Sequence, residues 1–429
     1  EITYGDWSSD VCSSDLDEIK RSIKIVGSGG NYEIVITEIG GTVGDIESLP
    51  YIESVRQMRW ELGPQNCVVI HLTLVPFLHA SGELKTKPTQ HSVKMLLEEG
   101  IQPDVLVLRT EHPLTEDLRK KVALFCNVEP GAVVESIDVS TIYEVPLMMQ
   151  KEMLDLTVLR KLGLSPGEEP SLAEWKEFLH KLKNPAHRVR IALVGKYVEL
   201  ADAYKSISES FIHAGAANEA AAEVTMIHSE EITDANYRTM LDGYDGIVVA
   251  PGFGSRGIEG KILTVNYART NDIPFLGICL GMQCAVIEFA RNVLGLEGAH
   301  STEINPKAKH PVIDLMEEQK SITEKGGTMR LGSYKCELLH GSEAWKCYRK
   351  EEISERHRHR YEFNNKYLAD FRNAGMIACG TNPESGLVEI IEIPSHRWFV
   401  GVQFHPEYSS TVIKPHPLFV GFVRACIRK

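Results

Sequence analysis

Cys279 stands between two glycines in a pattern typical of a catalytic nucleophile. The stretch Gly277–Gly281 (GICLG) follows the apolar run Ile273–Leu276 and precedes a helical pattern over residues 282–287. A cysteine at a sharp turn from strand to helix corresponds to the nucleophile elbow, in which serine is the usual residue. The start of the helix would also favour the thiolate, which is the reactive form. The stretch therefore predicts a cysteine nucleophile.

A histidine and a carboxylate follow another apolar run, Trp398–Phe404. His405 could act as the base for the thiol, and Glu407, two positions on, could orient the imidazole. Each piece taken alone is equally well explained as a core cysteine or as a histidine at the end of a strand. Their combination favours a triad of Cys279, His405 and Glu407.

A glycine-containing turn ends a third strand-like run, Gly246–Ala250. The turn continues through Gly252 to Gly254. Such a turn can donate a backbone N–H to a developing oxyanion, together with the N–H of Leu280. We therefore expect an oxyanion hole between this turn and the cysteine.

These pieces together resemble the class I glutamine amidotransferase domain, in which a Cys-His-Glu triad hydrolyses the side-chain amide of glutamine. The sequence has Ala-Pro-Gly at 250–252 where the family usually has Pro-Gly-Gly. Arg330 looks like part of a lid over the glutaminase site, and the basic run 356–360 could equally be a solvated surface. The resemblance implies glutamine-binding roles for Gly252, Leu280, Gly281, Met282, Gln283, Glu303 and Arg360.

The first half of the chain has two polar stretches of its own. Thr37–Glu47 places three acidic residues around a glycine-rich turn after a strand-like run. Carboxylates at strand ends of open α/β sheets commonly meet magnesium and nucleotide phosphates, although a solvated turn would look the same. Gly82–His91 adds two lysines, two threonines and a glutamine around a proline. Lysines supply charge for phosphate, although most surface lysine pairs are only solvated.

In this order, the two stretches and the glutaminase resemble the CTP synthase family from about Asp17 to the C-terminus. The resemblance implies the last step of de novo CTP synthesis, in which UTP is aminated with ATP and with ammonia from glutamine. It implies Mg²⁺ with ATP, activation by GTP, inhibition by CTP, and a homotetramer that can form filaments. It implies magnesium binding by Glu38 and UTP or CTP binding by Asp45, Ile46, Glu47, Lys85, Thr86, Lys87, Pro88, Thr89, Gln90 and Lys121.

Two other functions fit parts of the sequence. One is a different ATP-dependent synthetase with a glutaminase, of the cobyrinate-amidating type, and the Lys85–Gln90 loop argues against it. The other is a non-catalytic role in filaments or assembly. The complete triad argues against that as the sole role.

Composition favours a cytoplasmic enzyme. The nine cysteines form no CxxC pair, which is typical of a reducing compartment. The net charge of −13 argues against a nucleic-acid surface. No apolar run approaches the roughly 18 residues of a membrane span. We therefore expect neither nucleic acid nor membrane as a partner.

The elements that must position these residues form two alternating series of strands and helices. At 429 residues, two domains are expected. The first series has strand-like runs at 34–36, 67–72, 104–109, 122–125 and 132–134, and the second opens with Val189–Gly195. The sequence predicts an α/β fold with two doubly wound, mostly parallel-sheet domains, a P-loop-type synthetase domain that lacks its first part and a class I glutaminase domain. The expected ranges are 17–160 for the partial synthase domain, 161–187 for a linker and 188–429 for the amidotransferase domain.

The N-terminus departs from the family pattern. Residues 1–16 show no recognisable periodicity, and we interpret them as a foreign segment. The resemblance implies a P-loop, yet the sequence contains no G-x-x-x-x-G-K-[ST]. The sequence therefore predicts a truncated copy that keeps at most the glutaminase half-reaction.

Overall fold

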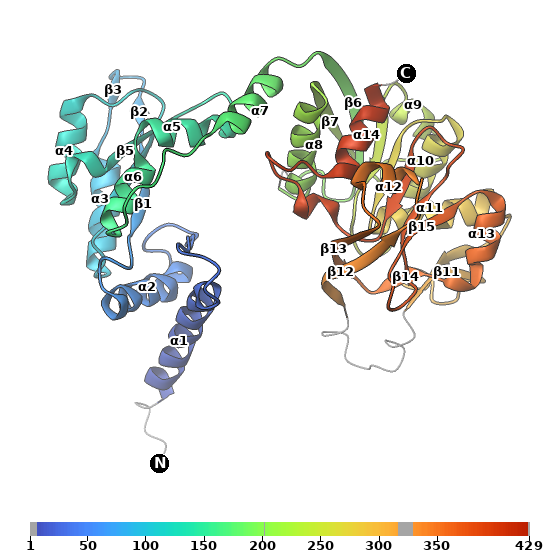
Figure 1. Cartoon of the computed structure of the whole chain (residues 1–429), viewed down its shortest axis with the longest axis horizontal. Coiled ribbons are helices and arrows are strands. Elements are labelled where there is room, and N and C mark those ends of the chain that lie inside the picture. Colours follow the sequence, from blue (N-terminus) through green and yellow to red (C-terminus); the bar gives the residue numbers. More distant parts are fainter. Residues whose placement is uncertain (1–6, 201, 316–328, 428–429) are drawn as a thin grey trace. The chain divides into compact units, whose positions relative to one another are not determined.

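The computed structural model describes residues 7–200, 202–315 and 329–427, with side chains from residue 15 onward. It divides into two compact units, Glu1–Leu172 and Ala173–Lys429. Both units are of the expected α/β class (Figure 1). No helix in the described ranges is long and apolar enough to cross a membrane.

Unit 1 is built on a parallel sheet of order β1-β4-β5. Val93 of α3 and Val122 of α4 pack on one face of the sheet, and Met149 of α5 packs on the other. The elements are α1 (Trp7–Ser28), α2 (Leu49–Leu62), β1 (Ile70–Val75), β2 (Phe77–Leu78), β3 (Glu83–Leu84), α3 (Lys87–Glu98), β4 (Val105–Thr110), α4 (Glu116–Cys126), β5 (Val133–Ile137), α5 (Val145–Lys151) and α6 (Leu154–Lys161).

The prediction is wrong for two of the five strands expected in this unit. Residues 34–36 form no strand, because no segment of the described chain pairs with them and a strand exists only through its ladder. Residues 122–125 lie inside α4. The Thr115 hydroxyl caps this helix by accepting from the Leu118 N–H at 3.3 Å, and Asn127 ends it in the left-handed conformation. The other three strands are present, displaced by one to three residues.

In the described residues of unit 2, nine strands form a sheet in the order β13-β12-β15-β16-β17-β9-β8-β6-β7. The run from β7 to β17 is parallel, and the strands from β16 to β13 extend it in antiparallel fashion. Helices α10 and α11 pack on one face, and α8 and α14 on the other (Figure 1). The sheet is thus covered on both faces, as a doubly wound fold requires.

The segment expected as a linker contains a helix that packs on unit 2. The expected linker, 161–187, contains α7, whose Phe178 ring lies 6.2 Å from that of His213 in α8. At the other end of the chain, α1 runs without a break through the expected boundary between residues 16 and 17. The helices and strands of unit 2 are α7 (Ala173–Lys183), β6 (His187–Gly195), α8 (Lys205–Ala217), β7 (Ala220–His228), α9 (Tyr237–Leu241), β8 (Gly246–Val249), α10 (Ile258–Thr270), β9 (Phe275–Ile278), α11 (Leu280–Asn292), β10 (Ala299–Ser301), β11 (His310–Leu315), β12 (Arg330–Leu338), α12 (Glu343–Tyr348), β13 (Glu352–His359), β14 (Tyr361–Phe363), α13 (Leu368–Ala374), β15 (Ile377–Thr381), β16 (Val388–Glu392), β17 (Phe399–Val402) and α14 (Pro417–Ile427).

Strand register gathers the candidate site at one edge of this sheet. Ile278 at the end of β9 pairs with Val402 at the end of β17, and Gly277 pairs with Val249 of β8. Val249 pairs in turn with Val194 of β6. Because these strands are parallel, the segments that follow them emerge side by side. The carboxyl edge of an open α/β sheet is where ligands usually bind.

Candidate active site

Cys279 occupies a strained turn between β9 and α11. Its backbone has φ 52° and ψ −102°, a combination that few residues other than glycine adopt. A Cβ on Gly277 would lie 2.7 Å from the backbone of Gly281, and a Cβ on Gly281 would lie 2.1 Å from the Val249 carbonyl oxygen. The turn therefore needs glycine on both sides. This is the geometry of a nucleophile elbow.

His405 and Glu407 lie directly after β17 and are both buried. The Nδ1 of His405 lies 2.8 Å from the Glu407 carboxylate. Its Nε2 makes no hydrogen bond within the described part of the chain. Burial opposes the charged imidazole, but the hydrogen bond to Glu407 and the charges of the nearby Cys279 and Glu407 outweigh it and raise the pKa of His405. The carboxylate therefore holds the imidazole, and the thiol is close enough to influence its pKa.

Gln403 is a polar neighbour of the thiol that our reading of the sequence missed. Its side-chain amide donates to the Cys279 Sγ at 3.5 Å, and its oxygen accepts from Gln283 at 3.2 Å. Gln283 also donates to the Tyr361 carbonyl at 3.0 Å. The available signal was a glutamine at the end of an apolar strand, two positions before the histidine.

The glycine turn after β8 lies beside the elbow. A Cβ on Gly252 would be 3.7 Å from Leu280, so the turn touches the first residue of α11. Glu303 accepts the Gly254 N–H at 3.1 Å. Met282 and Gln283 are buried in the first turn of α11, and Arg360 follows β13. The structure thus brings Gly252, Glu303 and the start of α11 together around Cys279.

Arg330 differs from the expected lid residue. It is buried at the start of β12, where its guanidinium lies 2.7 Å from Glu389 and 3.4 Å from Glu362. The guanidinium also lies over the Tyr334 ring, 4.2 Å from its centre. These partners hold Arg330 in the sheet, because a buried cation needs paired charge.

The acidic turn of unit 1 is exposed. Asp45 accepts the Thr42 N–H at 3.0 Å and precedes a short helical turn that contains Ile46 and Glu47. A Cβ on Gly44 would lie 2.2 Å from the terminal methyl of Met95 in α3, so the turn packs against that helix. The side chains of Asp45, Ile46 and Glu47 face solvent.

The lysine-rich loop continues into the first turn of α3. Thr89 is fully buried, and its hydroxyl donates to the Leu74 carbonyl at 3.2 Å. Thr86 is also buried and accepts from the Gln90 amide at 3.2 Å. Both threonine hydroxyls are therefore engaged inside the protein.

The cations of this loop are open to solvent. Lys87 and Pro88 are exposed in the first turn of α3, and Lys85 pairs with Glu83 at 2.6 Å. Lys121 is exposed on α4, which shares a core with α3. The structure thus places the lysines on the neighbouring helices α3 and α4 and in the loop before α3.

Glu38, the expected magnesium ligand, is exposed. No cluster of three or more His, Cys, Asp or Glu side chains suited to a metal occurs among the described residues. Mg²⁺ usually keeps several waters and is held by one or two carboxylates together with substrate phosphates. A single carboxylate such as Glu38 therefore fits this ion only as part of a nucleotide complex.

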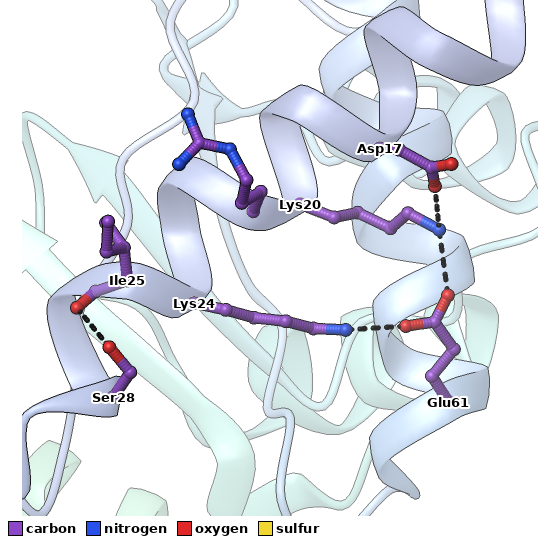
Figure 2. A pocket seen from close by; sticks show the side chains of 7 residues that line it. Asp17, Lys20, Lys24, Ile25, Ser28 and Glu61 are labelled. Carbon is purple, nitrogen blue, oxygen red and sulfur yellow. Dashed lines mark hydrogen bonds and ion pairs between the residues drawn. The ribbon is translucent and has the colours of Figure 1, made fainter.

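A surface hollow of about 480 Å³ lies between α1 and α2 in unit 1 (Figure 2). Its lysines are already paired: Lys20 lies 3.0 Å from Asp17 and 2.8 Å from Glu61, and Lys24 lies 2.7 Å from Glu61. None of the expected nucleotide-binding residues lines it. The hollow is therefore separate from the candidate sites.

Comparison with known proteins gives two family matches and many close relatives. The CTP synthase N-terminus family matches residues 7–164, and the class-I glutamine amidotransferase family matches residues 199–425. CTP synthase of Cytophaga hutchinsonii is 65% identical over 409 residues, which cover 95% of this chain and 76% of the relative. CTP synthase of Christiangramia forsetii is 64% identical over 409 residues, covering 95% and 75%. These matches do not favour the cobyrinate-amidating alternative.

A solved structure agrees with the architecture of unit 2. The glutaminase domain of Trypanosoma brucei CTPS with bound acivicin is 39% identical, with a TM-score of 0.54, and the match covers 56% of this chain and 94% of that domain. The two family matches follow each other along the sequence in the order of the two units. The chain therefore belongs to the CTP synthase family of glutamine-dependent ligases.

Proposed function

We propose that the chain releases ammonia from glutamine at Cys279, which is the glutaminase half-reaction of a synthesis that converts UTP to CTP at the expense of ATP. One observation carries the glutaminase part of this proposal. A strained cysteine at a nucleophile elbow lies beside a buried His405–Glu407 pair joined at 2.8 Å. That arrangement suits acyl transfer.

The proposed reaction begins with attack of the Cys279 thiolate on the amide carbon of glutamine. The C–S bond forms, the carbonyl electrons move to oxygen, and a tetrahedral oxyanion results. His405 then gives its proton to the amide nitrogen, the C–N bond breaks, and ammonia leaves. Water attacks the remaining thioester with His405 as base, which yields glutamate and the free thiol. Glu407 holds the imidazole in the correct tautomer throughout.

Backbone N–H groups would stabilise the oxyanion. Those of Gly252 and Leu280 belong to segments in contact with each other, one in the turn after β8 and one at the start of α11. Donors fixed before the reaction cost no reorganisation when the charge develops. The roles proposed for Glu303, Gln283 and Arg360 are to hold the glutamine around this hole.

In the proposed synthase half-reaction, ATP phosphorylates O4 of the UTP ring, and ammonia displaces the phosphate to give CTP. We place the triphosphate of UTP, or of CTP as inhibitor, near Lys87 and Lys121, which are exposed, and near Lys85, which is partly exposed and pairs with Glu83. Glu38 would hold Mg²⁺ with ATP, and the ion would neutralise phosphate charge when bound. Because Thr86 and Thr89 use their hydroxyls inside the protein, we propose that they support the loop.

Family membership also supports proposals about regulation and organisation. We propose activation by GTP, a homotetrameric assembly and a cytoplasmic location. We propose a synthase domain over 17–160 and an amidotransferase domain over 188–429, with the intervening segment as linker. The division of the chain into two compact units near residue 172 supports this organisation.

Replacing the nucleophile tests the proposal. Cys279→Ala should abolish glutamate release from glutamine, because the variant cannot form the thioester, while the thermal unfolding midpoint stays near that of the wild type. Cys284→Ala is the matched control, since this cysteine lies in α11, five residues after Cys279, and is fully buried. Glutamate release by Cys279→Ala at the wild-type rate would contradict the assignment.

A further inference from the structure

Two lysines are buried beside the glycine turn that follows β8. The exposed fraction is 1% for Lys196, which follows β6, and 0% for Lys261, which lies in α10. Burial lowers the pKa of both ammonium groups, that of Lys261 to about 8. Burying an ammonium is costly unless it is well hydrogen-bonded. Neither lysine has a part in the proposed chemistry, so the position of both needs another reason.

Both ammonium groups donate to carbonyls of the same turn. The Nζ of Lys196 lies 2.6 Å from the Phe253 oxygen and 2.7 Å from the Gly254 oxygen. The Nζ of Lys261 lies 2.6 Å from the Ala250 oxygen. Hydrogen bonds from a charged donor at these distances are among the stronger ones in proteins. The turn is therefore fixed on both sides of Gly252.

The peptide that carries the Gly252 N–H lies between the fixed groups. Its carbonyl belongs to Pro251, and the peptides at Ala250 and Phe253 are held by the lysines. A Cβ on Gly252 would lie 3.9 Å from the Lys196 side chain and 3.7 Å from Leu280. The Lys196 stem thus packs against Gly252. Leu280, whose N–H is the second proposed oxyanion donor, also contacts Gly252. Glu303 adds a further contact to the turn, because it accepts the Gly254 N–H at 3.1 Å.

We propose that Lys196 and Lys261 are positioning residues of the oxyanion hole, which clamp the turn so that the Gly252 N–H is aimed at the reacting carbonyl oxygen. This proposal rests on the proposed glutaminase function. The lysines act through the backbone and touch no substrate atom. Their clamp would make the hole available before glutamine binds, which is the condition under which such donors contribute most to the rate.

Lys196→Met is the principal test, because methionine keeps the stem and removes the charge and the donors. We expect kcat for glutamine hydrolysis to fall at least about tenfold, with the roughly 10²–10³-fold loss that follows removal of an oxyanion donor as the upper bound. The KM for glutamine should change less than about threefold, because the loss falls on the transition state. Lys261→Met should lower kcat less, since Lys261 holds a single carbonyl in the described contacts.

A second readout separates the clamp from a direct charge effect on the thiol. The rate of Cys279 alkylation by iodoacetamide should keep its pH profile in Lys196→Met, because alkylation forms no oxyanion. A displaced profile would assign the lysine to the thiolate and overturn the clamp. Unchanged kcat in Lys196→Met would overturn it as well.

Arg269→Met is the matched control for lost stability. Arg269 lies in α10 with Lys261, and its guanidinium pairs with the buried Glu288 at 2.7 Å, remote in sequence from the turn. We expect this variant to melt earlier and to keep its kcat. A comparable fall in kcat would show that stability, and not the clamp, controls the rate.

Amide hydrogen exchange tests the clamp without reference to activity. The Gly252 and Gly254 amides should exchange faster in Lys196→Met than in the wild type, while amides of β6 and β9 keep their rates. Unchanged exchange at the turn would contradict the clamp. If the wild type hydrolyses no glutamine while exchange responds as expected, the clamp stands and the proposed function fails.

Discussion

Single residues at the site adopt conformations and charges that would be unfavourable elsewhere. Cys279 has a positive φ, and Lys261 is a fully buried cation. His405 has a raised pKa, which reflects close charged neighbours. Strain and buried charge are common at functional sites, because the surrounding fold compensates for them. Here the compensation comes from the two glycines of the elbow and from backbone carbonyls.

The buried charge of Lys261 predicts a pH dependence of stability. Its pKa falls from 10.5 in the unfolded chain to about 8 in the folded one. Between pH 8 and pH 10.5 the unfolded chain binds more protons than the folded one. The free energy of unfolding should therefore increase by about 3 kcal/mol as the pH rises through this range, and this gain should be absent below pH 8. Urea titrations of the wild type and Lys261→Met from pH 7 to 10.5 measure the difference. An equal pH dependence in the two proteins would contradict the prediction.

Lys87, which is exposed at the start of α3, is expected to contribute to the binding of the UTP phosphates. Lys87→Ala should weaken UTP binding about tenfold, because a charge-assisted contact to phosphate contributes on the order of 1.5–3 kcal/mol. Isothermal titration calorimetry measures the Kd. Lys94→Ala is the control, since Lys94 is exposed on the same helix and lies 3.7 Å from Glu98. Equal losses in the two variants would point to general charge attraction.

At the scale of elements, the register of parallel strands assembles the site. Residues far apart in sequence, such as Cys279 and His405, meet because β9 and β17 are adjacent and end at the same level. The turn after β8 joins them through the pairing of β8 with β9. The close approach of α11 to β8 needs a glycine at position 281, because the Val249 carbonyl leaves no space for a side chain.

This close packing predicts the effect of a single methyl group. Gly281→Ala should lower the free energy of unfolding by about 1–3 kcal/mol, as overpacking does, and should reduce glutamine hydrolysis by moving Cys279. Thermal melting and glutamate release measure the two effects. Gly131→Ala provides the comparison, because a Cβ there meets no atom within 4 Å. Full activity and stability in Gly281→Ala would show that the elbow tolerates a shift.

At the scale of the whole molecule, the chain consists of two units with separate cores. Unit 2 contains the complete triad, the oxyanion turn and both buried lysines. Unit 1 contains the proposed nucleotide lysines and Glu38. The proposed ammonia source and the proposed ammonia acceptor thus belong to different units of one chain.

Separate cores predict that unit 2 folds alone. Residues 173–429 should melt cooperatively and release glutamate from glutamine with a kcat within about threefold of that of the full chain, because every group assigned to the triad and the hole lies within them. Far-ultraviolet circular dichroism and a glutamate assay test this. The same fragment with Cys279→Ala controls for background hydrolysis. An aggregated or inactive fragment would mean that unit 1 is needed for the fold of unit 2.

The sequence by itself determined the features that depend on local spacing. The glycines around Cys279, the pair His405 and Glu407, and the strands that precede them are read from neighbouring residues, because a sharp turn and a strand end have local signatures. The family and the α/β class followed from the same motifs. The sequence also contained signals that we misread: Thr115 and Asn127 are the caps that make residues 122–125 helical.

Only the tertiary structure decided the features that depend on which segments lie side by side. It placed the Gln403 amide on the thiol, Lys196 and Lys261 on the turn, and Arg330 among buried glutamates. A lysine or an arginine in a sequence is by default a solvated residue, so nothing local distinguishes these cations. Residues 34–36 carry a strand pattern without a strand, because a ladder needs a neighbour that local sequence cannot supply.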